Sequence, residues 1–430
     1  MFFGGKFWKR SGTDLSGGRL MTKKLRLIVL CPHFEPDMAP TGVVMTRIVH
    51  ELAARGHELH VVTSLPWYRK HQVEDGWAGG LWRVEKTSWG SISRVQPFAG
   101  KTKSNLIRRA VGFVLFSYFV GLRALFVGGF WRRTDGVLAM SPPLTLGLIG
   151  WHTKLFRGGK LVFNIQDVFP DAAVETGAIS NRRVIAAAKW LERVSYHKSD
   201  SVVLLSDDLA NNVQGKLDQR FHKRIKVIPN FVDTQAIVPM SRMTKYRSEL
   251  GIDDSPIVMY AGNVGFSQSL ELMVEAAKAM PNVAFVINGE GAARKSLESM
   301  AKSLANLKFG DYQDASRLGE VLATGDLHVV ALRRGLGSVS VPSKTYSILA
   351  AGRPICAAID LDTEVHRILL TAGAGVCVEP DDSLAFVSAI SGLISDQSAL
   401  EEMGRRGRKW VEGHASPQSV AQRYEALYLR

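Results

Sequence analysis

The residues of this 430-residue chain that could do chemistry stand in loops that follow strand-like segments. The loop VPSKTYS at residues 341–347 places one cation, Lys344, between hydroxyl residues at the expected start of a helix, 347–351. An ammonium group beside the unpaired N–H groups of a helix N-terminus is a good cradle for a diphosphate. We therefore predict that this loop binds phosphate groups. The residues concerned are Ser343, Lys344, Thr345, Tyr346 and Ser347.

Two further loops in the second half of the chain contain glycines at places where backbone could approach a ligand closely. In YAGNVGFSQS, residues 260–269, Gly262 and Gly265 have this freedom, although a glycine pair also suits an ordinary turn. In NGEG, residues 288–291, the Asn-Gly pair strongly favours a tight turn. Neither loop identifies a ligand by itself.

The first half has two candidate loops. In NIQDVFPD, residues 164–171, carboxylates and amides at a strand end could orient sugar hydroxyls or support acid–base chemistry, with Asp167 the main candidate. Helix caps and turns favour the same residue types. In PHFEPDMAPTG, residues 32–42, Thr41 and Gly42 stand where the chain enters a helix whose N-terminus could hold an anion. An ordinary strand-to-helix loop explains that segment equally well.

The elements that position these loops alternate regularly between short β-branched runs and helical patterns, which predicts parallel, doubly wound sheets. Strands are expected at 25–31, 58–63, 136–139, 160–165 and 201–205, and again at 257–261, 283–287, 327–331, 354–358 and 375–378. Both patterns fail near 234–245. We predict an α/β fold of two Rossmann-like domains, 24–238 and 239–412, followed by a helical segment, 413–430, and preceded by a disordered or mis-assigned extension, 1–23. Ligands of such sheets bind at the carboxyl ends of the strands.

The charge of the chain is uneven. The 54 Lys and Arg against 40 Asp and Glu leave a net charge of +14, which suggests an acidic partner such as a nucleic acid, an anionic membrane or a phosphorylated small molecule. Residues 101–133 hold seven cations and no acid, which is half of the surplus. The three cysteines lie far apart, which argues against a disulfide framework and a zinc cluster.

The basic stretch is also strongly apolar between residues 110 and 131. Three interpretations stay open: a helix in the membrane interface, a buried core helix with a basic rim, or a membrane span interrupted by Arg123. Flanking cations and aromatic residues favour the interface. The predicted membrane contacts are Lys101, Lys103, Arg108, Arg109, Phe113, Phe116, Phe119 and Arg123.

Taken together and in order, the motifs resemble those of the family 4 glycosyltransferases of GT-B fold. The likeness is greatest to the subgroup that builds bacterial surface polysaccharides such as O-antigen, capsule and colanic acid. It spans about residues 24–430 and rests on PHFEPDMAPTG, NIQDVFPD, VIPNFVD, YAGNVGFSQSLE, INGEG, PSKTYSILAAGRP and the segment from MGRRGRKW to YEALY.

The resemblance implies a retaining transfer of a hexosyl or N-acetylhexosaminyl group, without a metal ion or cofactor. The donor would be a nucleoside-diphosphate sugar, with UDP favoured over GDP. The acceptor would be a lipid-linked, polyprenyl-diphosphate sugar at the cytoplasmic face of the inner membrane, which the protein would contact peripherally.

The resemblance also implies roles for residues. Asp167, Lys344 and Glu290 would be catalytic, with Lys344 stabilising the departing diphosphate and Glu290 facing the donor sugar. The donor would contact Gly262, Asn263, Gly265, Phe266, Gly289, Phe309, Tyr312, Ser343, Thr345, Tyr346 and Ser347. The acceptor or phosphate loop would comprise Thr41, Gly42 and Gln166. The terminal helix would cross back onto the first domain.

Three departures from the family pattern stand out. The Glu-x7-Glu pair that usually surrounds the donor is replaced by Val339 and Ser347, and what takes its place is open. The Arg and Lys common after the first strand of the second domain are Asn263 and Gln268. The His that often precedes the first-domain Asp corresponds to Gln166.

Other function classes remain as alternatives. A nucleic-acid-binding protein fits the charge, but the basic segment is interleaved with apolar residues and no reader motif is present. A nucleotide-sugar epimerase would have the same double-Rossmann shape. A non-catalytic membrane scaffold is compatible with the missing Glu pair.

Overall fold

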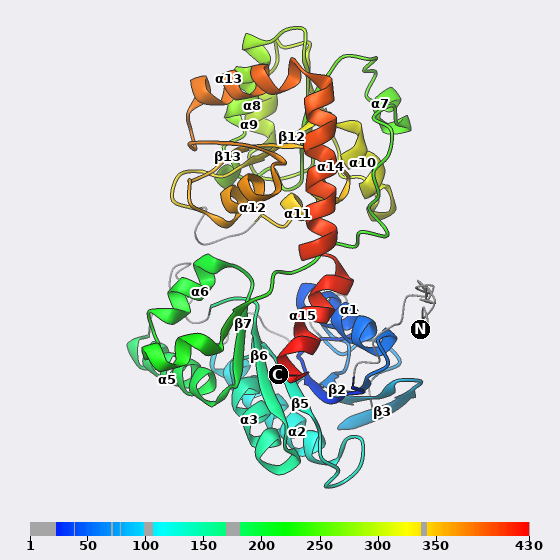
Figure 1. Cartoon of the computed structure of the whole chain (residues 1–430), viewed down its shortest axis with the longest axis vertical. Coiled ribbons are helices and arrows are strands. Elements are labelled where there is room, and N and C mark those ends of the chain that lie inside the picture. The colour runs from blue at the N-terminus through cyan, green and yellow to red at the C-terminus, as the bar shows by residue number, and fades with distance from the viewer. Residues whose placement is uncertain are drawn as a thin grey trace, which may run out of the picture.

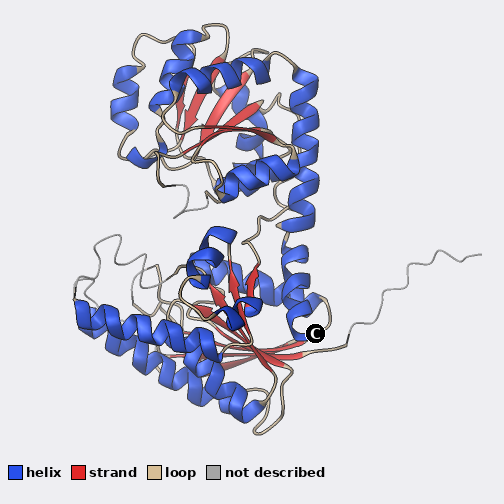
Figure 2. Cartoon of the chain, turned by 60° about the vertical axis from the view of Figure 1, so that its left-hand side comes forward, coloured by secondary structure: helices blue, strands red, loops and turns tan. Residues whose placement is uncertain are grey.

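The structure, a computed structural model, describes residues 23–37, 39–69, 72–77, 79–98, 106–168, 181–336 and 342–429. The chain forms two layered α/β halves, one above the other, with two helices running along one side of both (Figures 1 and 2). Residues 1–22 of the predicted N-terminal extension, and Asp171, lie outside the described residues.

The first half is built on an eight-stranded sheet in the order β3-β4-β2-β1-β5-β6-β7-β8. All neighbours are parallel except β3, which runs antiparallel to β4 at the edge. The strands are β1 (Arg26–Leu30), β2 (Glu58–Ser64), β3 (Trp82–Thr87), β4 (Gly90–Val95), β5 (Gly136–Ser141), β6 (Lys160–Ile165), β7 (Ser201–Leu204) and β8 (Ile225–Val227). The five expected strands are present, whereas β3, β4 and β8 were not expected.

Helices cover both faces of this sheet because its central strands are apolar on both sides. In β1, Ile28 and Leu30 pack toward α2, whereas Leu27 and Val29 pack toward α1. The helices of this half are α1 (Pro40–Ala54), α2 (Leu106–Phe126), α3 (Thr145–Arg157), α5 (Arg182–Lys198) and α6 (Asp207–Gln214). Helices α2, α3 and α5 lie side by side on one face.

A buried arginine fixes the carboxyl end of α2 against α3. The guanidinium of Arg157, which is 1% exposed, donates hydrogen bonds to the carbonyl oxygens of Ala124, Leu125, Val127 and Arg132 at 2.8–3.0 Å. Carbonyls in the last turn of a helix have no partner within the helix, so this side chain supplies the donors that they lack.

The second half contains a wholly parallel six-stranded sheet in the order β11-β10-β9-β12-β13-β14. Its strands are β9 (Ile257–Ala261), β10 (Ala284–Asn288), β11 (Leu307–Gly310), β12 (Leu327–Ala331), β13 (Ile355–Ala358) and β14 (Gly375–Val378). Its helices are α7 (Lys245–Glu249), α8 (Glu271–Ala279), α9 (Arg294–Met300), α10 (Leu318–Thr324), α11 (Lys344–Ala350), α12 (Glu364–Ala372), α13 (Ser383–Ile394) and α14 (Gln397–His414). The strand order reverses between β9 and β12, the place where open sheets bind ligands.

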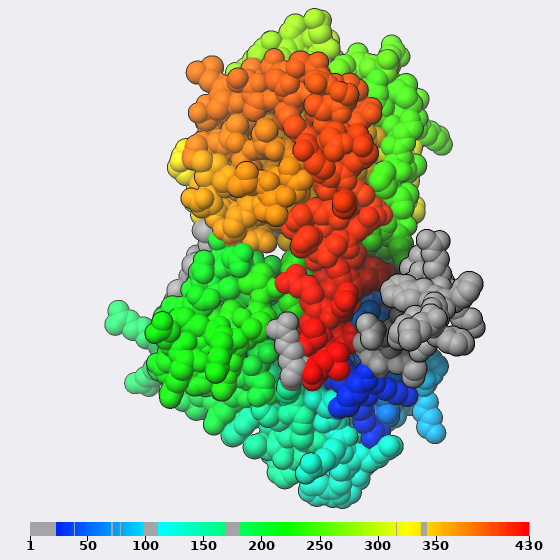
Figure 3. All heavy atoms as spheres, in the orientation of Figure 1, coloured from blue at the N-terminus to red at the C-terminus, as the bar shows by residue number. Residues whose placement is uncertain are grey.

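The chain returns to the first half through α15 (Pro417–Leu429), so that α14 and α15 together lie across both halves (Figure 3). Helix α15 packs on α1 and places Glu425 against Arg55 and His57. Tyr424 bonds to Asn164 at the end of β6. The predicted crossing of the terminal helix onto the first domain is therefore confirmed.

The carboxyl edges of the two sheets face each other. Helix α6 follows β7 and α12 follows β13, and the two helices meet through Asp208. The carboxylate of Asp208 accepts hydrogen bonds from the backbone N–H of Glu364, at 3.2 Å, and from the guanidinium of Arg367, at 2.9 Å. Loops that follow the strands of either sheet are therefore directed toward the other half.

Candidate functional site

A cavity of about 630 Å³ opens at the reversal point of the second sheet. Its wall combines the carboxyl ends of β9, β10 and β12 with the loop after β11 and the first turn of α11. The cavity is lined by six residues for which the sequence predicts a role in ligand binding or catalysis: Gly262, Asn263, Tyr312, Ser343, Lys344 and Ser347. Asn288, Gln268 and Asp314 line it as well. Among the described residues that line the cavity, Lys344 and Asp314 are the charged ones.

Lys344 is held in this cavity by an aromatic ring instead of an acid. Its Nζ lies 3.8 Å from the centroid of the Tyr260 ring and donates a hydrogen bond to the phenolic oxygen at 2.6 Å. The Tyr260 hydroxyl in turn donates to the carbonyl oxygen of Asn263 at 2.5 Å. Among the described residues, no carboxylate forms an ion pair with Lys344. Burial without a counter-ion lowers the pKa of Lys344 to about 7.

Helix α11 begins at Lys344, three residues before the expected start at Ser347. The earlier start turns Thr345 and Tyr346 away from the cavity and into the protein. Thr345 is fully buried, and Tyr346 stacks on Trp410 with ring centroids 6.5 Å apart. Of the predicted phosphate loop, Ser343, Lys344 and Ser347 therefore face the cavity.

Two amide side chains in the cavity wall have fixed orientations. Asn288 accepts a hydrogen bond at Oδ1 from the Tyr246 hydroxyl, which leaves its amide nitrogen toward the cavity. Gln268 accepts at Oε1 from the backbone N–H of Gly265 at 2.9 Å, which leaves its own nitrogen free to donate. The N–H of Gly265 is thus occupied, so the predicted contact from that N–H to a phosphate is absent in this arrangement, and Gln268 takes its place as a donor.

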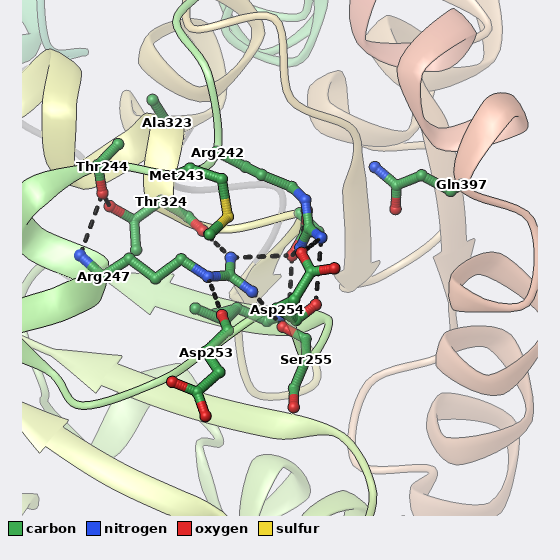
Figure 4. Close-up of polar contacts among 12 residues, drawn as sticks. Arg242, Met243, Thr244, Arg247, Asp253, Asp254, Ser255, Ala323, Thr324 and Gln397 are labelled. Carbon is green, nitrogen blue, oxygen red and sulfur yellow. Dashed lines mark hydrogen bonds and ion pairs between the residues drawn. The ribbon is translucent and has the colours of Figure 1, made fainter.

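A buried arginine positions Tyr246 on the short helix α7. Arg247, 1% exposed, donates to the carbonyl oxygens of Asp253, at 2.6 Å, and Thr324, at 3.3 Å (Figure 4). It also lies 3.4 Å from Asp326. Its guanidinium also contacts the carbonyl oxygen of Ser255. These bonds tie α7 to the second sheet, and through Tyr246 they determine the orientation of Asn288.

Glycine brings the loops after β9 and β10 into backbone contact. At Gly289, with φ of +141°, an added Cβ would lie 1.9 Å from the carbonyl oxygen of Gly262. Any other residue would therefore force the two loops apart. We predicted that the backbone at these glycines could approach a ligand closely, but here it approaches the backbone of the neighbouring loop. The adjacent residues Asn288 and Asn263 line the cavity.

Glu290 takes part in an ion-pair cluster and does not line the cavity. Arg294 of α9 lies 2.7 Å from Glu290, 2.8 Å from Glu298 and 2.8 Å from Asp311. The same guanidinium donates to the carbonyl oxygens of Gly289 and Gly310, at 2.9 and 3.2 Å. Arg294 therefore joins the loops after β10 and β11. Its spacing of four residues from Glu290 is the sequence signal that could have identified this pair.

Two other predicted donor contacts also lie outside the cavity lining. Phe309 sits within β11 and packs against the hydrophobic core of the second half, because that segment is a strand and not the expected loop. Phe266 is 61% exposed on the turn that follows β9.

Two family models match the chain in tandem, one over each half. Residues 41–230 match the glycosyl transferase 4-like domain, and residues 242–410 match glycosyl transferases group 1. The chain belongs to the family 4 glycosyltransferases. The cavity described above lies in its group 1 half.

Curated relatives of this glycosyltransferase include two bacterial proteins. The putative colanic acid biosynthesis glycosyl transferase WcaI of Escherichia coli is 28% identical over 85% of this chain and 91% of its own length. The probable glycosyltransferase WbjE of Pseudomonas aeruginosa is 26% identical over 70% of this chain and 76% of its own length.

Solved structures confirm the GT-B fold predicted for the glycosyltransferase. A sucrose-phosphate synthase from Thermosynechococcus elongatus has a TM-score of 0.67 and 16% identity, covering 94% of this chain and 98% of its own. HepE of Anabaena, solved in complex with UDP, has a TM-score of 0.65 and 13% identity, covering 93% and 98%.

In the first half of the glycosyltransferase, Asp167 and Gln166 follow β6 at the carboxyl edge of the first sheet, which faces the second half. The Asp167 carboxyl has no hydrogen bond to another described residue, and the surrounding protein raises its pKa. The Gln166 amide donates to Asn164 at 2.6 Å and accepts from Asn230 at 3.0 Å, and Asn164 also bonds to Tyr424. Gln166 thus belongs to a buried network that links β6, α15 and Asn230, which lies in the segment between β8 and α7.

Gly42 of the predicted acceptor loop has a packing role. An added Cβ would lie 2.8 Å from the Cβ of His33, so the first turn of α1 can rest on that side chain only with glycine at this position. Thr41 beside it is half-buried. No side chain caps the N-terminus of α1, which begins at Pro40.

Helix α2 of the glycosyltransferase presents one face to the core and one to solvent. Phe116 is 3% exposed, so this predicted membrane contact is wrong because the side chain packs in the core. Arg123 turns inward, where it donates to Ser93 at 3.1 Å. Phe113 and Phe119 are half-buried. Lys101 and Lys103, and the side chains of Arg108 and Arg109, lie outside the described residues.

The outer face of α2 carries apolar residues at helical spacing: Val111, Val114, Leu115, Tyr118, Leu122 and Phe126, which are 38–61% exposed. None of the helices in the described part of the chain has the length and hydropathy that a membrane span requires.

Proposed function

We propose that this glycosyltransferase moves a sugar from a nucleoside-diphosphate sugar, with UDP favoured, to a lipid-linked acceptor in the synthesis of a bacterial surface polysaccharide. The names of two relatives support the pathway: WcaI is a putative colanic acid enzyme, and LpsE of Rhizobium meliloti, 26% identical over 55% of this chain, acts in lipopolysaccharide core biosynthesis. The structures of HepE with UDP support the donor class.

The observation that carries the proposal is the position of Lys344 at the first residue of α11. It rests on Tyr260, lines the cavity and forms no ion pair with a described residue. Cleavage of a nucleotide sugar develops negative charge on the departing diphosphate, and a preorganised cation stabilises that charge. The amide nitrogens of Asn288 and Gln268 would donate to the phosphate oxygens that Lys344 does not reach. In this proposal the transfer needs no metal ion, because Lys344 supplies the positive charge.

Retention of the anomeric configuration is the further element of the proposal. Asp167 would orient sugar hydroxyls from the facing half, where its carboxyl is not engaged by other described side chains. NMR of the first-formed product tests this stereochemistry, and an inverted linkage would exclude retention.

A thermal-shift panel of nucleoside diphosphates and nucleotide sugars tests the donor site. At a hundredfold excess over Kd, a ligand that binds only the native state stabilises it by about 2.7 kcal/mol. We expect one base to raise the melting temperature of the wild type and to lose most of that effect in Lys344→Ala. The matched control is Lys302→Ala, an exposed lysine of the same half. Equal shifts and turnover in both variants would disprove the assignment of Lys344.

Contact with an anionic membrane surface completes the proposal. Four exposed aromatic rings form a continuous cluster where α2 and α3 end: Phe126 and Phe130 lie 5.0 Å apart, Phe130 and Trp131 4.9 Å, and Trp131 and Phe156 6.3 Å. They are 44–60% exposed. Aromatic rings in an exposed apolar patch beside basic residues are typical of a surface that enters the headgroup region of a bilayer.

Co-sedimentation with vesicles of phosphatidylglycerol and phosphatidylethanolamine tests this surface. We expect the wild type to sediment with the vesicles and Trp131→Asp to remain largely in the supernatant. The matched control is Leu384→Asp in α13, an apolar side chain that is 85% exposed in the other half. Equal binding by both variants would exclude the aromatic cluster as the membrane contact.

A further inference from the structure

Outside the donor cavity, a buried histidine and carboxylate pair joins two loops of the first half. His33 donates from Nδ1 to the carboxylate of Asp37 at 2.7 Å. The same carboxylate, 1% exposed, accepts the backbone N–H groups of Trp67 at 3.4 Å and Tyr68 at 3.3 Å. A carboxylate with three donors is well satisfied, so the two loops are held in one arrangement.

The pair also settles which nitrogen of His33 is available. In the tautomer whose Nδ1 donates a hydrogen bond to Asp37, Nε2 is an acceptor. Nε2 has no hydrogen-bond partner among the described residues, and it is not among the buried atoms that lack one. It is therefore accessible and able to accept a hydrogen bond from a ligand hydroxyl.

Two aromatic rings stand beside this nitrogen. The His33 ring stacks on Trp67, with centroids 5.4 Å apart, and meets the edge of Tyr68 at 5.5 Å. Trp67 is half-buried and Tyr68 is 41% exposed. Rigid aromatic faces beside a fixed acceptor suit a pyranose ring, whose C–H faces pack on aromatic carbon while its hydroxyls form hydrogen bonds.

The two loops follow β1 and β2, which are adjacent parallel strands with Leu30 paired to Val62. They therefore lie at the carboxyl edge of the first sheet, which faces the second half through Asp208 and α12. A ligand on these aromatic rings is on the side of the first half from which transfer would take place.

We propose that His33, Trp67 and Tyr68 form a subsite for the acceptor, in which Tyr68 and Trp67 pack on a pyranose ring and Nε2 of His33 accepts a hydrogen bond from one of its hydroxyls. This inference rests on the proposed function, because it assigns the acceptor class to a place in the first half. Asp37 is a positioning residue, since it acts on the sugar only through His33 and the two loops.

Saturation-transfer NMR with water-soluble methyl glycosides tests the subsite without a lipid. The probes are the methyl α-glycosides of glucose, galactose, mannose, N-acetylglucosamine and fucose, each mixed with the full-length protein and UDP. We expect ring-proton signals from at least one glycoside, their loss in Tyr68→Ala and their retention in Tyr68→Phe, which keeps the ring. His33→Asn should weaken them at least fivefold. The control Trp190→Ala, which removes an exposed ring of α5, should leave them unchanged.

The same samples separate this inference from the proposed function. A nucleotide-induced rise in melting temperature that is equal in wild type and Tyr68→Ala shows an intact fold and donor site. Against that background, the absence of signal from every glycoside, or a signal that survives Tyr68→Ala, would overturn the subsite. Absence of any nucleotide effect in the wild type would instead overturn the proposed donor function.

Discussion

Lys344 rests on the ring of Tyr260, with its Nζ 3.8 Å from the ring centroid and 2.6 Å from the phenolic oxygen. An aromatic ring attracts the ammonium group without neutralising it. A carboxylate in the same place would compete with a diphosphate for the cation. The pair therefore holds the Lys344 amine in a fixed position inside the cavity, where it forms no ion pair with a described residue, and this arrangement has measurable consequences.

The first consequence is a pH dependence of donor binding. The pKa of Lys344 is about 7 in the ligand-free protein, and an adjacent diphosphate favours the charged form. Below pH 7 the amine is already protonated, so affinity should be nearly constant. Above pH 7 binding must take up a proton, so affinity should fall by up to about tenfold per pH unit. Calorimetry with UDP-glucose between pH 6 and 9 measures this, since its phosphates do not titrate there.

Lys344→Met supplies the control for this pH dependence. The variant should bind UDP-glucose weakly and with the same affinity at pH 6 and pH 9. A wild-type affinity that does not change over this range would show that Lys344 keeps its charge throughout or does not touch the diphosphate.

The second prediction concerns the hydroxyl of Tyr260. Tyr260→Phe keeps the ring beneath Lys344 but removes the oxygen that accepts its hydrogen bond. One such bond contributes about 1 kcal/mol, so donor affinity should fall roughly fivefold. Titration with UDP-glucose measures the loss. A larger loss in Tyr260→Phe than in Lys344→Met would mean that the hydroxyl acts on the donor directly.

The third prediction concerns the orientation of Asn288. Asn288→Asp replaces the amide nitrogen that faces the cavity by a second carboxylate oxygen, which would repel the diphosphate. We expect at least a tenfold loss of donor affinity. Tyr246→Phe removes the hydroxyl that fixes the amide and should cause a smaller loss. Unchanged affinity in Asn288→Asp would place the phosphates elsewhere in the cavity.

The sequence predicted the strands of both sheets except β3, β4, β8 and β11, because apolar runs and turn residues are local signals. Lys344, Asn263 and Ser347, which the sequence had indicated as ligand contacts, line one cavity, and that they bind a donor stays a prediction. The helix of Lys344 starts one turn earlier than expected, and for that reason Thr345 and Tyr346 are buried instead of exposed to the ligand.

The contacts that the sequence did not reveal join residues far apart in the chain. Tyr260 meets Lys344 across 84 positions, and Tyr246 meets Asn288 across 42. Such pairs depend on how strands order within a sheet, which a local pattern does not specify. The pair of Glu290 and Arg294 has a spacing of four residues that could have identified it. The pair of His33 and Asp37 has the same spacing, but it lies in a loop, where this spacing does not predict a contact.

The fourth prediction concerns the docking of α15 on the first half. The backbone N–H of Leu25 donates to Nδ1 of His57, and Nε2 of His57 lies 3.0 Å from Glu425, so the native ring is neutral. Burial lowers the pKa of His57, so below pH 6.5 the unfolded chain binds a proton that the native protein does not. Stability from this site is present above pH 6.5 and is lost as the pH falls below it. His57→Gln should flatten the decline in melting temperature between pH 7 and 5, and an identical decline in both proteins would refute this.

The fifth prediction concerns Arg157, which holds the end of α2 beneath the exposed aromatic cluster. Arg157→Met keeps much of the side-chain volume but leaves the carbonyl oxygens of Ala124, Leu125 and Val127 without their donors. Each unsatisfied buried polar group costs roughly 1–3 kcal/mol, so a loss of at least 3 kcal/mol in the free energy of unfolding is expected. Urea denaturation measures this loss. The control is Arg183→Met, an exposed arginine on α5, which should change the value by less than about 0.5 kcal/mol.

A loss below 1 kcal/mol in Arg157→Met would mean that water replaces the guanidinium at these carbonyls. In a folded preparation, weaker vesicle binding by Arg157→Met would show that the end of α2 must be fixed for the aromatic cluster to form.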